Sequence, residues 1–437
     1  MKTVLISGIS SNSGKTVVSL CIESGLQKLG KKFTAFKFGP DFIDPSYHRL
    51  FAECYNLDPV MSSPDFVKYL FATKSSEYNL IEGAMGIFDG ETYGSSTYDL
   101  SKILGAKIIL CIDVFAMGES IRAIAKGLKD VISGIVAVKV GSEHHLEIIT
   151  KALEKENVKL LGYLPKSEKF EIPSRHLGLY LADEVKQKIK KDELQDIFFK
   201  FFDVDQIMKI FDQSDVRFEY SQDIENKIFG SVNYESLKKR KVAILSGSYF
   251  PFIYPENIFI LRRLGFDVYE IELDQKPLDF DVLFIPGGYP ENFADEMEEI
   301  VAKLMEFLKI PKLVVAECGG LEILSSKILY NGREIKCAGV FPFEIKIEEK
   351  LQALGWRKLE NKNKEVWQKG HEFHYGKISN INPEGIFLKY DSKGRLLGSD
   401  GFVKEKFIAL WTHLYFGSNP KSIAELISSC SVGGISN

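Results

Sequence analysis

The sequence of 437 residues lacks the features that mark several classes of protein. Its six cysteines are scattered, without a Cys-x-x-Cys pair or a short metal-ligand spacing. That distribution argues against a zinc site or a disulfide framework and favours free thiols in a reducing cytosol. No apolar run approaches the roughly 18–20 residues that a membrane-spanning helix needs. The N-terminal apolar run leads directly into a glycine loop, so we expect no signal peptide.

Charge of one sign is also not in excess. Lysine and arginine number 56 against 60 aspartate and glutamate residues, which gives a formal net charge of −4. This balance predicts neither a nucleic-acid partner nor a membrane partner. Hydrophobic residues make up 45% and charged residues 27% of the chain, a composition typical of globular proteins. We therefore expect a cytoplasmic protein whose length suggests two or three domains.

The first half of the chain alternates short β-rich runs with helical stretches. Six apolar segments are predicted to be buried strands: Thr3–Ser7, Phe33–Lys37, Leu80–Glu82, Ile108–Asp113, Ile135–Val140 and Lys159–Leu164. Periodic segments between them, such as Val17–Leu29 and His145–Glu156, are typical of helices. This alternation predicts βαβ units and a mainly parallel sheet.

A charged stretch from Asp183 to about Lys241 separates this half from a second one. We interpret it as terminal helices followed by a linker. The α/β pattern then restarts, with strands predicted at 242–246, 268–271, 282–286 and 313–317 and helices at 255–264 and 293–308. A fresh strand after a charged linker indicates a domain boundary near residues 235–240. The sequence therefore predicts two α/β domains, residues 1–235 and 240–437.

A glycine-rich loop, Gly8-Ile-Ser-Ser-Asn-Ser-Gly14-Lys15-Thr16, follows the first predicted strand and opens the first predicted helix. Small residues allow the backbone to wrap phosphate groups, and a helix N-terminus presents free N–H groups to them. We expect Gly14 and Lys15 to bind ATP and the Thr16 hydroxyl to bind Mg²⁺. Five residues separate the two glycines, instead of the standard four. The alternative is a Ser/Gly-rich turn without a ligand.

Four acidic residues follow predicted strands of the same half. Asp41 and Asp44 come after the second strand, Glu82 ends the third, and Asp89 follows in the next loop. Because the carboxyl ends of parallel strands form the ligand crevice of such sheets, we expect these acids near the phosphate loop. A carboxylate placed there commonly holds Mg²⁺. The alternative for each single acid is a helix cap or a solvated loop.

In the second half, Cys318 stands between an apolar strand and a Gly-Gly helix start, which is typical of a nucleophile elbow. A thiol at a helix N-terminus is expected to be biased toward thiolate. The backbone N–H groups of Gly319 and Gly288 are candidates for an oxyanion hole. His413 is the candidate general base. The alternatives are a buried structural thiol and a core histidine.

These segments together resemble the cobyrinate a,c-diamide synthase family over nearly the whole chain. The matching segments begin at Gly8, Lys37 (Lys-Phe-Gly-Pro-Asp-Phe-Ile-Asp-Pro-Ser-Tyr-His), Glu82 (Glu-Gly-Ala-Met-Gly-Ile-Phe-Asp-Gly), Arg175 (Arg-His-Leu-Gly-Leu), Pro286 (Pro-Gly-Gly-Tyr-Pro-Glu), Ala316 (Ala-Glu-Cys-Gly-Gly-Leu), Leu351 (Leu-Gln-Ala-Leu-Gly), Gly370 (Gly-His-Glu-Phe-His-Tyr) and His413 (His-Leu-Tyr-Phe-Gly-Ser-Asn-Pro). In this family the five-residue spacing of the phosphate loop is usual.

The resemblance implies a fold of two α/β domains. The first is a dethiobiotin-synthetase-like P-loop domain with a mainly parallel sheet, and the second is a class I glutamine amidotransferase domain of flavodoxin-like type. It also implies residue roles: Lys15, Thr16 and Gly14 for ATP; Asp41 and Asp89 for ATP and substrate; Glu82, Asp44 and Thr16 for Mg²⁺; Cys318 as nucleophile and His413 as base.

Two parts of the second site stay open at the level of the sequence. Many class I amidotransferases carry a glutamate two residues after the histidine, where this chain has Tyr415. The third member of the triad is therefore a backbone carbonyl or another acid. His371 and His374 lie in a family motif that serves either substrate contact or a structural turn, because two histidines around one acid are weak evidence for a metal site.

The activity implied by the resemblance is ATP- and glutamine-dependent amidation of the a- and c-acetate carboxylates of cobyrinate, a corrinoid. The alternatives are the same chemistry on nickel-sirohydrochlorin or hydrogenobyrinate, a ParA-like ATPase switch with a partner-binding second domain, and a dethiobiotin-type carboxylase. The expected ligands are ATP, Mg²⁺, L-glutamine and a tetrapyrrole polycarboxylate. The oligomeric state stays open between monomer and homodimer.

Overall fold

The computed structural model describes residues 1–167, 174–175, 178–179, 181–182, 190–214, 216–217, 222–230 and 240–430. The chain divides into two compact units. The first contains Met1–Pro59 and Val67–Tyr220, and the second contains Val60–Phe66 and Ser221–Asn437. The predicted boundary near residues 235–240 falls almost wholly outside the described residues and stays a prediction. So does the predicted Arg175-His-Leu-Gly-Leu motif, of which residues 176 and 177 are not described.

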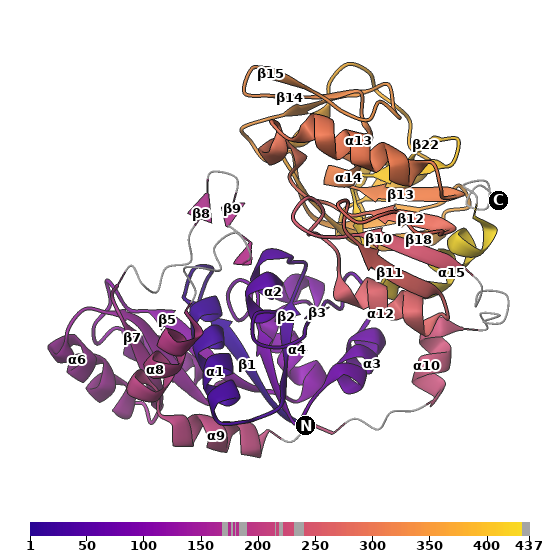
Figure 1. The fold of residues 1–437 in the computed structure, drawn as a ribbon. Coiled ribbons are helices and arrows are strands. Elements are labelled where there is room, and N and C mark those ends of the chain that lie inside the picture. Colours follow the sequence, from indigo (N-terminus) through magenta and orange to yellow (C-terminus); the bar gives the residue numbers. More distant parts are fainter. Residues whose placement is uncertain are drawn as a thin grey trace. The chain divides into compact units, whose positions relative to one another are not determined.

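The first unit is built on a seven-stranded sheet with the order β3-β2-β4-β1-β5-β6-β7 (Figure 1). Its neighbouring strands all pair in parallel, as the sequence predicts. The strands are β1 (Lys2–Gly8), β2 (Phe33–Phe38), β3 (Cys54–Leu57), β4 (Tyr78–Glu82), β5 (Lys107–Asp113), β6 (Gly134–Val140) and β7 (Leu160–Pro165). The edge strand β3 is not among the predicted strands.

Helices cover this sheet and build its core. They are α1 (Lys15–Lys28), α2 (Ile43–His48), α3 (Pro64–Lys74), α4 (Thr97–Leu104), α5 (Ile121–Leu128), α6 (Glu143–Glu154), α8 (Lys191–Phe201) and α9 (Val204–Gln213). On one face α1 packs between the sheet and α8, with Ile22 and Leu26 buried against Phe198. A Cβ at Gly25 would stand 2.1 Å from the Phe198 ring, so the two helices approach closely only because this residue is glycine.

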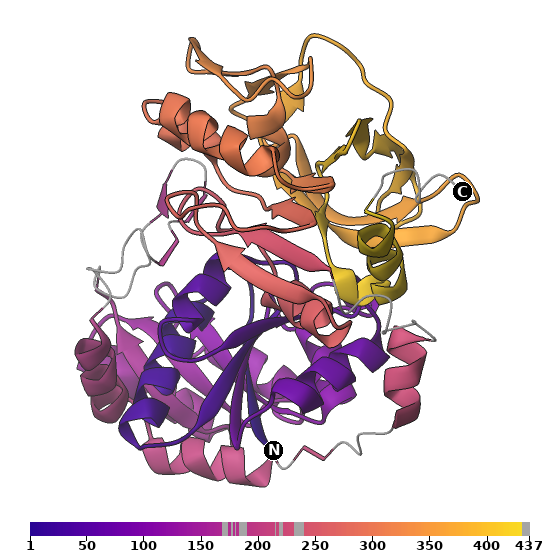
Figure 2. The same ribbon diagram turned by 45° about the vertical axis from the view of Figure 1, so that its right-hand side comes forward.

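The second unit contains a six-stranded sheet with the order β11-β10-β12-β13-β23-β22, in which the last pair is antiparallel. Its strands are β10 (Lys241–Leu245), β11 (Asp267–Ile271), β12 (Val282–Ile285), β13 (Leu313–Glu317), β22 (Phe402–Lys404) and β23 (Phe407–Leu410). Its helices are α10 (Gln222–Phe229), α12 (Pro255–Arg263), α13 (Met297–Leu308), α14 (Gly319–Leu324) and α15 (Pro420–Ser429). In Figures 1 and 2, α13 lies along one face of this sheet, where it packs into the core.

Two smaller sheets extend the second unit, and the sequence does not predict them. One has the order β15-β14-β16-β19 and the other the order β21-β20-β17-β18-β24. Their strands are β14 (Lys327–Tyr330), β15 (Arg333–Lys336), β16 (Glu344–Ile347), β17 (Ala353–Glu360), β18 (Val366–His374), β19 (Gly376–Ile378), β20 (Phe387–Tyr390), β21 (Leu396–Asp400) and β24 (His413–Leu414). Along the described part of the chain, no helix is both long and apolar enough to cross a membrane.

Candidate functional sites

The glycine-rich loop joins β1 to α1 in the first unit. Gly14 caps the helix with φ 82°, a left-handed conformation that favours glycine. A Cβ on Gly8 would stand 2.0 Å from Oγ of Ser13, so the loop is tightly wound. The Lys15 ammonium donates to the carbonyls of Ser10, at 3.1 Å, and Met85, at 2.7 Å. The lysine therefore lies back across its own loop, where phosphates bind in loops of this kind.

Glu82, at the end of β4, is the centre of a buried polar cluster beside this loop. Its Oε1 accepts hydrogen bonds from the Thr16 hydroxyl and the Lys37 ammonium, both at 2.9 Å. Its Oε2 lies 3.0 Å from Nε2 of His48. The other ring nitrogen of His48 lies 2.6 Å from Glu23 on α1. The cluster thus fixes the Glu82 carboxylate toward the first residues of α1.

The charges of this cluster depend on one another. Burial alone would raise the pKa of Glu82, but Lys37 and His48 hold it well below its usual range. Burial alone would lower the pKa of His48, but Glu23 and Glu82 raise it to about 10. Glu82 is therefore an anion and His48 a cation near neutral pH. Burial raises the pKa of Asp44 to about 8, with nearby Asp41 adding to the effect.

Three of the predicted acids have local partners. Asp44 lies 2.5 Å from the Lys37 ammonium. Asp41 accepts backbone N–H groups of Ile43, at 2.8 Å, and Asp44, at 3.1 Å, and so caps the start of α2. Asp89 accepts the Gly86 N–H at 2.8 Å. These bonds leave the expected nucleotide and substrate roles of Asp41 and Asp89 as predictions.

The hydroxyl and carboxylate oxygens of Thr16 and Glu82 are of the kind that Mg²⁺ takes as ligands. Within the described residues, no group of three or more His, Cys, Asp or Glu side chains is arranged to hold a metal by itself. Nucleotide-bound Mg²⁺ typically keeps several waters and needs only one or two protein oxygens besides the phosphates. Thr16 and Glu82 fit that arrangement, and the expected role of Asp44 as a further Mg²⁺ ligand stays a prediction.

In the second unit, Cys318 lies at a sharp turn between β13 and α14. Its backbone has φ 49° and ψ −109°, an unfavourable conformation for a residue with a side chain. The Cys318 N–H donates to the Leu410 carbonyl at 2.8 Å, which ties the turn to the end of β23. The strained nucleophile elbow predicted from the sequence is therefore present.

The two glycines predicted as oxyanion donors lie against each other. A Cβ on Gly319 would stand 2.6 Å from the Gly288 backbone nitrogen. Neither position tolerates a side chain, because a Cβ on Gly288 would lie 2.2 Å from the Tyr249 carbonyl. The elbow and the loop after β12 thus bring their backbones together beside Cys318.

His413 begins β24, a short strand that pairs with β18. Its imidazole packs against Gly287, where a Cβ would stand 2.3 Å from the ring carbon Cε1. The ring stacks on His371 with a centroid distance of 5.1 Å, and Tyr254 donates to or accepts from Nδ1 of His371 at 2.7 Å. His413 thus lies against the glycine loop that also approaches Gly319, so the structure gathers the predicted base and both predicted donors.

The ionisation of this site differs from the prediction. Burial raises the pKa of the Cys318 thiol well above its usual value, Glu322 adds to the effect, and the Gly319 N–H only partly opposes it. The expectation of a thiolate at rest is therefore wrong, because desolvation outweighs the helix terminus. Burial, with His371 and His374, lowers the pKa of His413 well below its usual value. The histidine is neutral and able to accept a proton.

His374, the second histidine of the motif, has a local role. Its ring lies 2.8 Å from the Gly376 carbonyl and stacks on Trp411 at 4.1 Å. Glu372, between the two histidines, is paired with Arg357, at 2.6 Å, and Lys389, at 2.5 Å. These contacts hold the motif within the second unit, while His371 also lies against His413, and a role of the motif in substrate contact stays a prediction.

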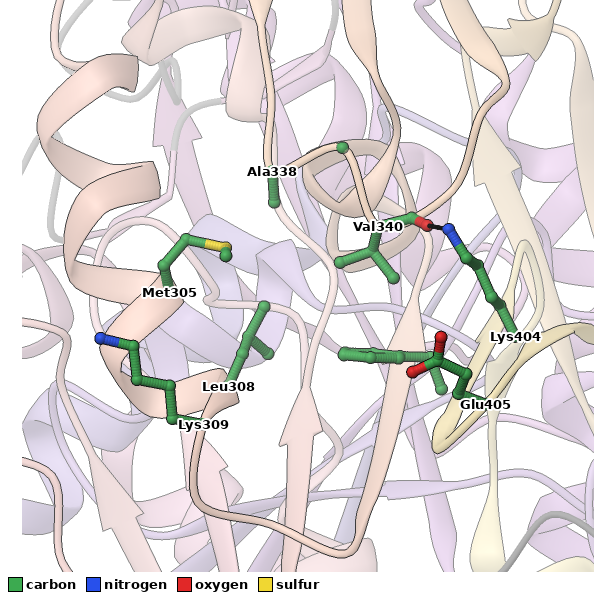
Figure 3. A pocket seen from close by; sticks show the side chains of 9 residues that line it. Met305, Leu308, Lys309, Ala338, Val340, Lys404 and Glu405 are labelled. Carbon is green, nitrogen blue, oxygen red and sulfur yellow. Dashed lines mark hydrogen bonds between the residues drawn. The ribbon is translucent and has the colours of Figure 1, made fainter.

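A surface cavity of about 290 Å³ in the second unit does not coincide with this site. In Figure 3, Met305 and Leu308 of α13 lie on one side, and Lys404 and Glu405 of the β22–β23 hairpin lie on the other. The Lys404 ammonium points to the Val340 carbonyl, 2.6 Å away (Figure 3). No residue of the cysteine elbow lines the cavity.

Sequence reasoning missed three residues of the phosphate site: Lys37, His48 and Glu23. Lys37 and His48 lie in the segment used for the family resemblance, yet residue type and spacing gave them no role. Two signals could have indicated them: the lysine stands at the end of an apolar strand, and the histidine is the last residue of the same motif. Glu23 carried one signal, an acid on the apolar face of α1, where it is fully buried.

The comparisons with known proteins cover both halves of the chain. Residues 4–179 match the CobQ/CobB/MinD/ParA nucleotide binding domain. Residues 241–421 match the CobB/CobQ-like glutamine amidotransferase domain. A cobyrinate a,c-diamide synthase of Saccharolobus solfataricus is 34% identical, with 96% of this chain and 98% of that protein aligned. One of Picrophilus torridus is 32% identical, with 98% and 99% aligned.

The chain belongs to the cobyrinate a,c-diamide synthase family. The identities extend over both halves of the chain, so they are not due to the nucleotide-binding half alone. The family assignment confirms the fold class predicted from the sequence: a nucleotide-binding α/β unit followed by a glutamine amidotransferase unit. It also explains why one chain holds both a phosphate loop and a cysteine elbow.

Proposed function

We propose that this member of the family is an ATP-dependent ligase that amidates the a- and c-acetate carboxylates of cobyrinate with ammonia from glutamine. The observation that carries the proposal is the presence, in one family member, of a phosphate loop beside Glu82 and a strained cysteine elbow beside His413. A carboxylate is a poor electrophile and ammonia is mostly protonated near neutral pH. Amide formation therefore needs one site that activates the carboxylate and a second site that releases ammonia from glutamine.

In the first unit, a substrate carboxylate oxygen attacks the γ-phosphorus of ATP, ADP leaves, and the carboxylate becomes an acyl phosphate. Gly14 and the N-terminus of α1 hold the phosphates. Lys15 leaves its two carbonyl partners and neutralises the negative charge of the phosphoryl group during its transfer. Mg²⁺, bound with the nucleotide, would neutralise phosphate charge. Thr16 and Glu82 are the residues that would hold it, with Glu82 kept anionic by Lys37.

In the second unit, the Cys318 sulfur attacks the side-chain carbonyl of glutamine. Because the thiol is protonated at rest, His413 must take its proton as the bond forms. The N–H groups of Gly288 and Gly319 stabilise the negative oxygen of the tetrahedral intermediate. His413 then gives the proton to the departing ammonia. A γ-glutamyl thioester remains on Cys318, and water releases it as glutamate.

Ammonia then attacks the acyl phosphate, and phosphate leaves as the amide forms. The cysteine elbow argues against the two alternatives from other classes, because a ParA-like switch or a dethiobiotin-type carboxylase needs no nucleophilic thiol. The relatives' names favour cobyrinate over other tetrapyrroles. We also propose that the protein works in the cytoplasm and binds neither nucleic acid nor membrane, in line with its net charge of −4.

The substrate is tested by incubating the purified chain with ATP, Mg²⁺ and glutamine and one of three macrocycles. These are cobyrinate, hydrogenobyrinate and nickel-sirohydrochlorin, and products are followed by mass spectrometry. Two carboxyl-to-amide conversions on cobyrinate, at the highest kcat/KM of the three, support the proposal. Preferential amidation of another macrocycle would overturn the choice of substrate. No amidation of any, together with no hydrolysis of glutamine, would overturn the proposed reaction.

A further inference from the structure

We propose that Glu317, the residue before the nucleophile, is the positioning residue that orients His413 and stabilises it as it takes the thiol proton. The inference rests on the proposed function of Cys318 and His413. Glu317 would be the third group of a Cys-His-acid arrangement. In class I amidotransferases this group is usually a glutamate two residues after the histidine, whereas Glu317 directly precedes the cysteine.

The first observation is the position of the Glu317 carboxylate. Its Oε2 lies 4.0 Å from Nδ1 of His413. Its Oε1 accepts the backbone N–H of Leu414 at 3.3 Å. One carboxylate thus holds both the ring and the backbone of the strand that carries the base. The 4.0 Å separation is an ion-pair distance, and such contacts often shorten when substrate binds.

The second observation is that strand register fixes this arrangement. Glu317 is the last residue of β13 and pairs with Leu410 of β23. The Cys318 N–H donates to the same Leu410. The chain turns sharply at Cys318, with φ 49° and ψ −109°. The carboxylate that approaches His413 and the nucleophile are therefore adjacent in sequence but separated by this turn.

The third observation is that other side chains near His413 are unsuited to this role. Tyr415, at the position of the usual glutamate, is fully buried and makes an edge-to-face contact with Tyr254. Glu372 is held by Arg357 and Lys389. Asp400 accepts the backbone N–H groups of Trp411 and Thr412, at 3.0 and 3.1 Å.

Burial favours the neutral form of both groups of the pair before substrate binds. Both side chains are less than one-tenth exposed, at 2% for His413 and 9% for Glu317. Burial raises the pKa of Glu317 to about 8, and the Leu414 N–H partly opposes it. His371 and His374 of β18 also act on His413, and both disfavour an imidazolium. An ionised Glu317 favours it.

The mechanism that follows is a proton transfer from Cys318 to His413 and then to ammonia, with Glu317 beside the imidazole. His413 accepts the Cys318 proton at Nε2 while its Nδ1–H points to the Glu317 carboxylate. In its ionised form, which a pKa of about 8 keeps accessible near neutral pH, Glu317 pairs with the imidazolium that forms, so that this cation is not isolated in a buried site. When the proton passes to ammonia, the neutral tautomer with Nδ1–H is restored. Glu317 neither touches glutamine nor changes its own covalent bonds.

The test compares Glu317→Gln and Glu317→Asp with Tyr415→Phe in the full-length protein, using glutamine and ammonium chloride separately as nitrogen source. Glu317→Gln should lower kcat of glutaminase roughly 10²-fold, since an amide cannot stabilise the imidazolium. The acid limb of the pH profile of kcat/KM for glutamine should move to lower pH. Glu317→Asp should fall between Glu317→Gln and wild type, and Tyr415→Phe should resemble wild type.

Amidation with ammonium chloride separates a failure of this inference from a failure of the proposed function. It should be unchanged in all three variants, which also shows that they are folded. A wild-type glutaminase pH profile in Glu317→Gln, or an Asp variant no better than the Gln variant, would overturn the role of Glu317. A Cys318→Ser variant that still uses glutamine would instead overturn the proposed function itself.

Discussion

The hydroxyl of Thr16 donates a 2.9 Å hydrogen bond to Oε1 of Glu82, across 66 positions of sequence. The first residues of α1 and the end of β4 are thereby joined at the phosphate loop. The same oxygen of Glu82 accepts the Lys37 ammonium, which leaves the carboxylate anionic within a buried site. A hydroxyl and an anionic carboxylate at this distance form a pair suited to Mg²⁺.

Glu82→Gln should keep the shape of this pair and remove its charge. We expect the Mg²⁺ concentration for half-maximal amidation to rise roughly 10–100-fold, the scale seen when the surroundings of a metal site are altered. Amidation is measured against Mg²⁺ concentration with ammonium chloride as nitrogen source, so that any change in glutaminase activity does not affect the result. Glu77→Gln, at an exposed position before the same strand, is the matched control. An unchanged Mg²⁺ curve in Glu82→Gln would make Glu82 a structural acid.

Lys15→Ala should abolish amidation with either nitrogen source, because the lysine no longer neutralises the negative charge of the phosphoryl group during its transfer. Hydrolysis of glutamine should persist, since that chemistry belongs to the second unit. Lys28→Ala, an exposed lysine of the same helix α1, should amidate like wild type. Wild-type amidation by Lys15→Ala would be incompatible with the assigned phosphate loop.

His48→Gln should destabilise the first unit. Without the imidazolium, Glu23 and Glu82 face each other in a buried site, and loss of one partner of such a pair costs about 3–5 kcal/mol. Urea unfolding followed by circular dichroism would measure the change. His144→Gln, on the exposed side of α6, should shift stability by less than about 0.5 kcal/mol. Equal stability of the two variants would show that His48 does not hold the cluster together.

Asp400→Asn should impair glutaminase through the loop that precedes His413. The Asp400 carboxylate accepts the N–H groups of Trp411 and Thr412 and the Thr412 hydroxyl, the last at 2.7 Å. An amide would point an NH₂ group at one of these donors, at a cost of about 1–3 kcal/mol. We expect a lower melting temperature and lower glutamine-dependent turnover, with ammonium-dependent turnover retained. If both turnovers fell equally, Asp400 would stabilise the whole chain rather than the loop.

The sequence predicted the parallel strands well because buried strands of parallel sheets are continuous apolar runs. It missed β3, an edge strand of four residues, and the strands between Lys327 and Asp400, in which charged residues interrupt the apolar ones. Predicted strands β1 and β13 end at the phosphate loop and at the cysteine elbow, so the chemical motifs were found with them. Both motifs lie where a strand turns into a helix.

The network around each motif could not be predicted in the same way. His48 acts on Glu82 only because α2 and β4 bring the two side chains together. The ionisation of Cys318 was predicted wrongly, since a local pattern shows a helix terminus but not the burial that outweighs it. The position of Glu317 beside His413 likewise depends on the register between β13 and β23.

The measurement that tests the central claim most directly is amidation by Cys318→Ser with glutamine and, separately, with concentrated ammonium chloride at alkaline pH. Without the thiol no thioester forms, so glutamine-dependent turnover should fall by several orders of magnitude. Ammonium-dependent turnover should equal that of wild type, because free ammonia reaches the acyl phosphate without the second unit. Retained glutamine-dependent turnover, or loss of both activities in a folded variant, would contradict two separate sites with Cys318 as the nucleophile.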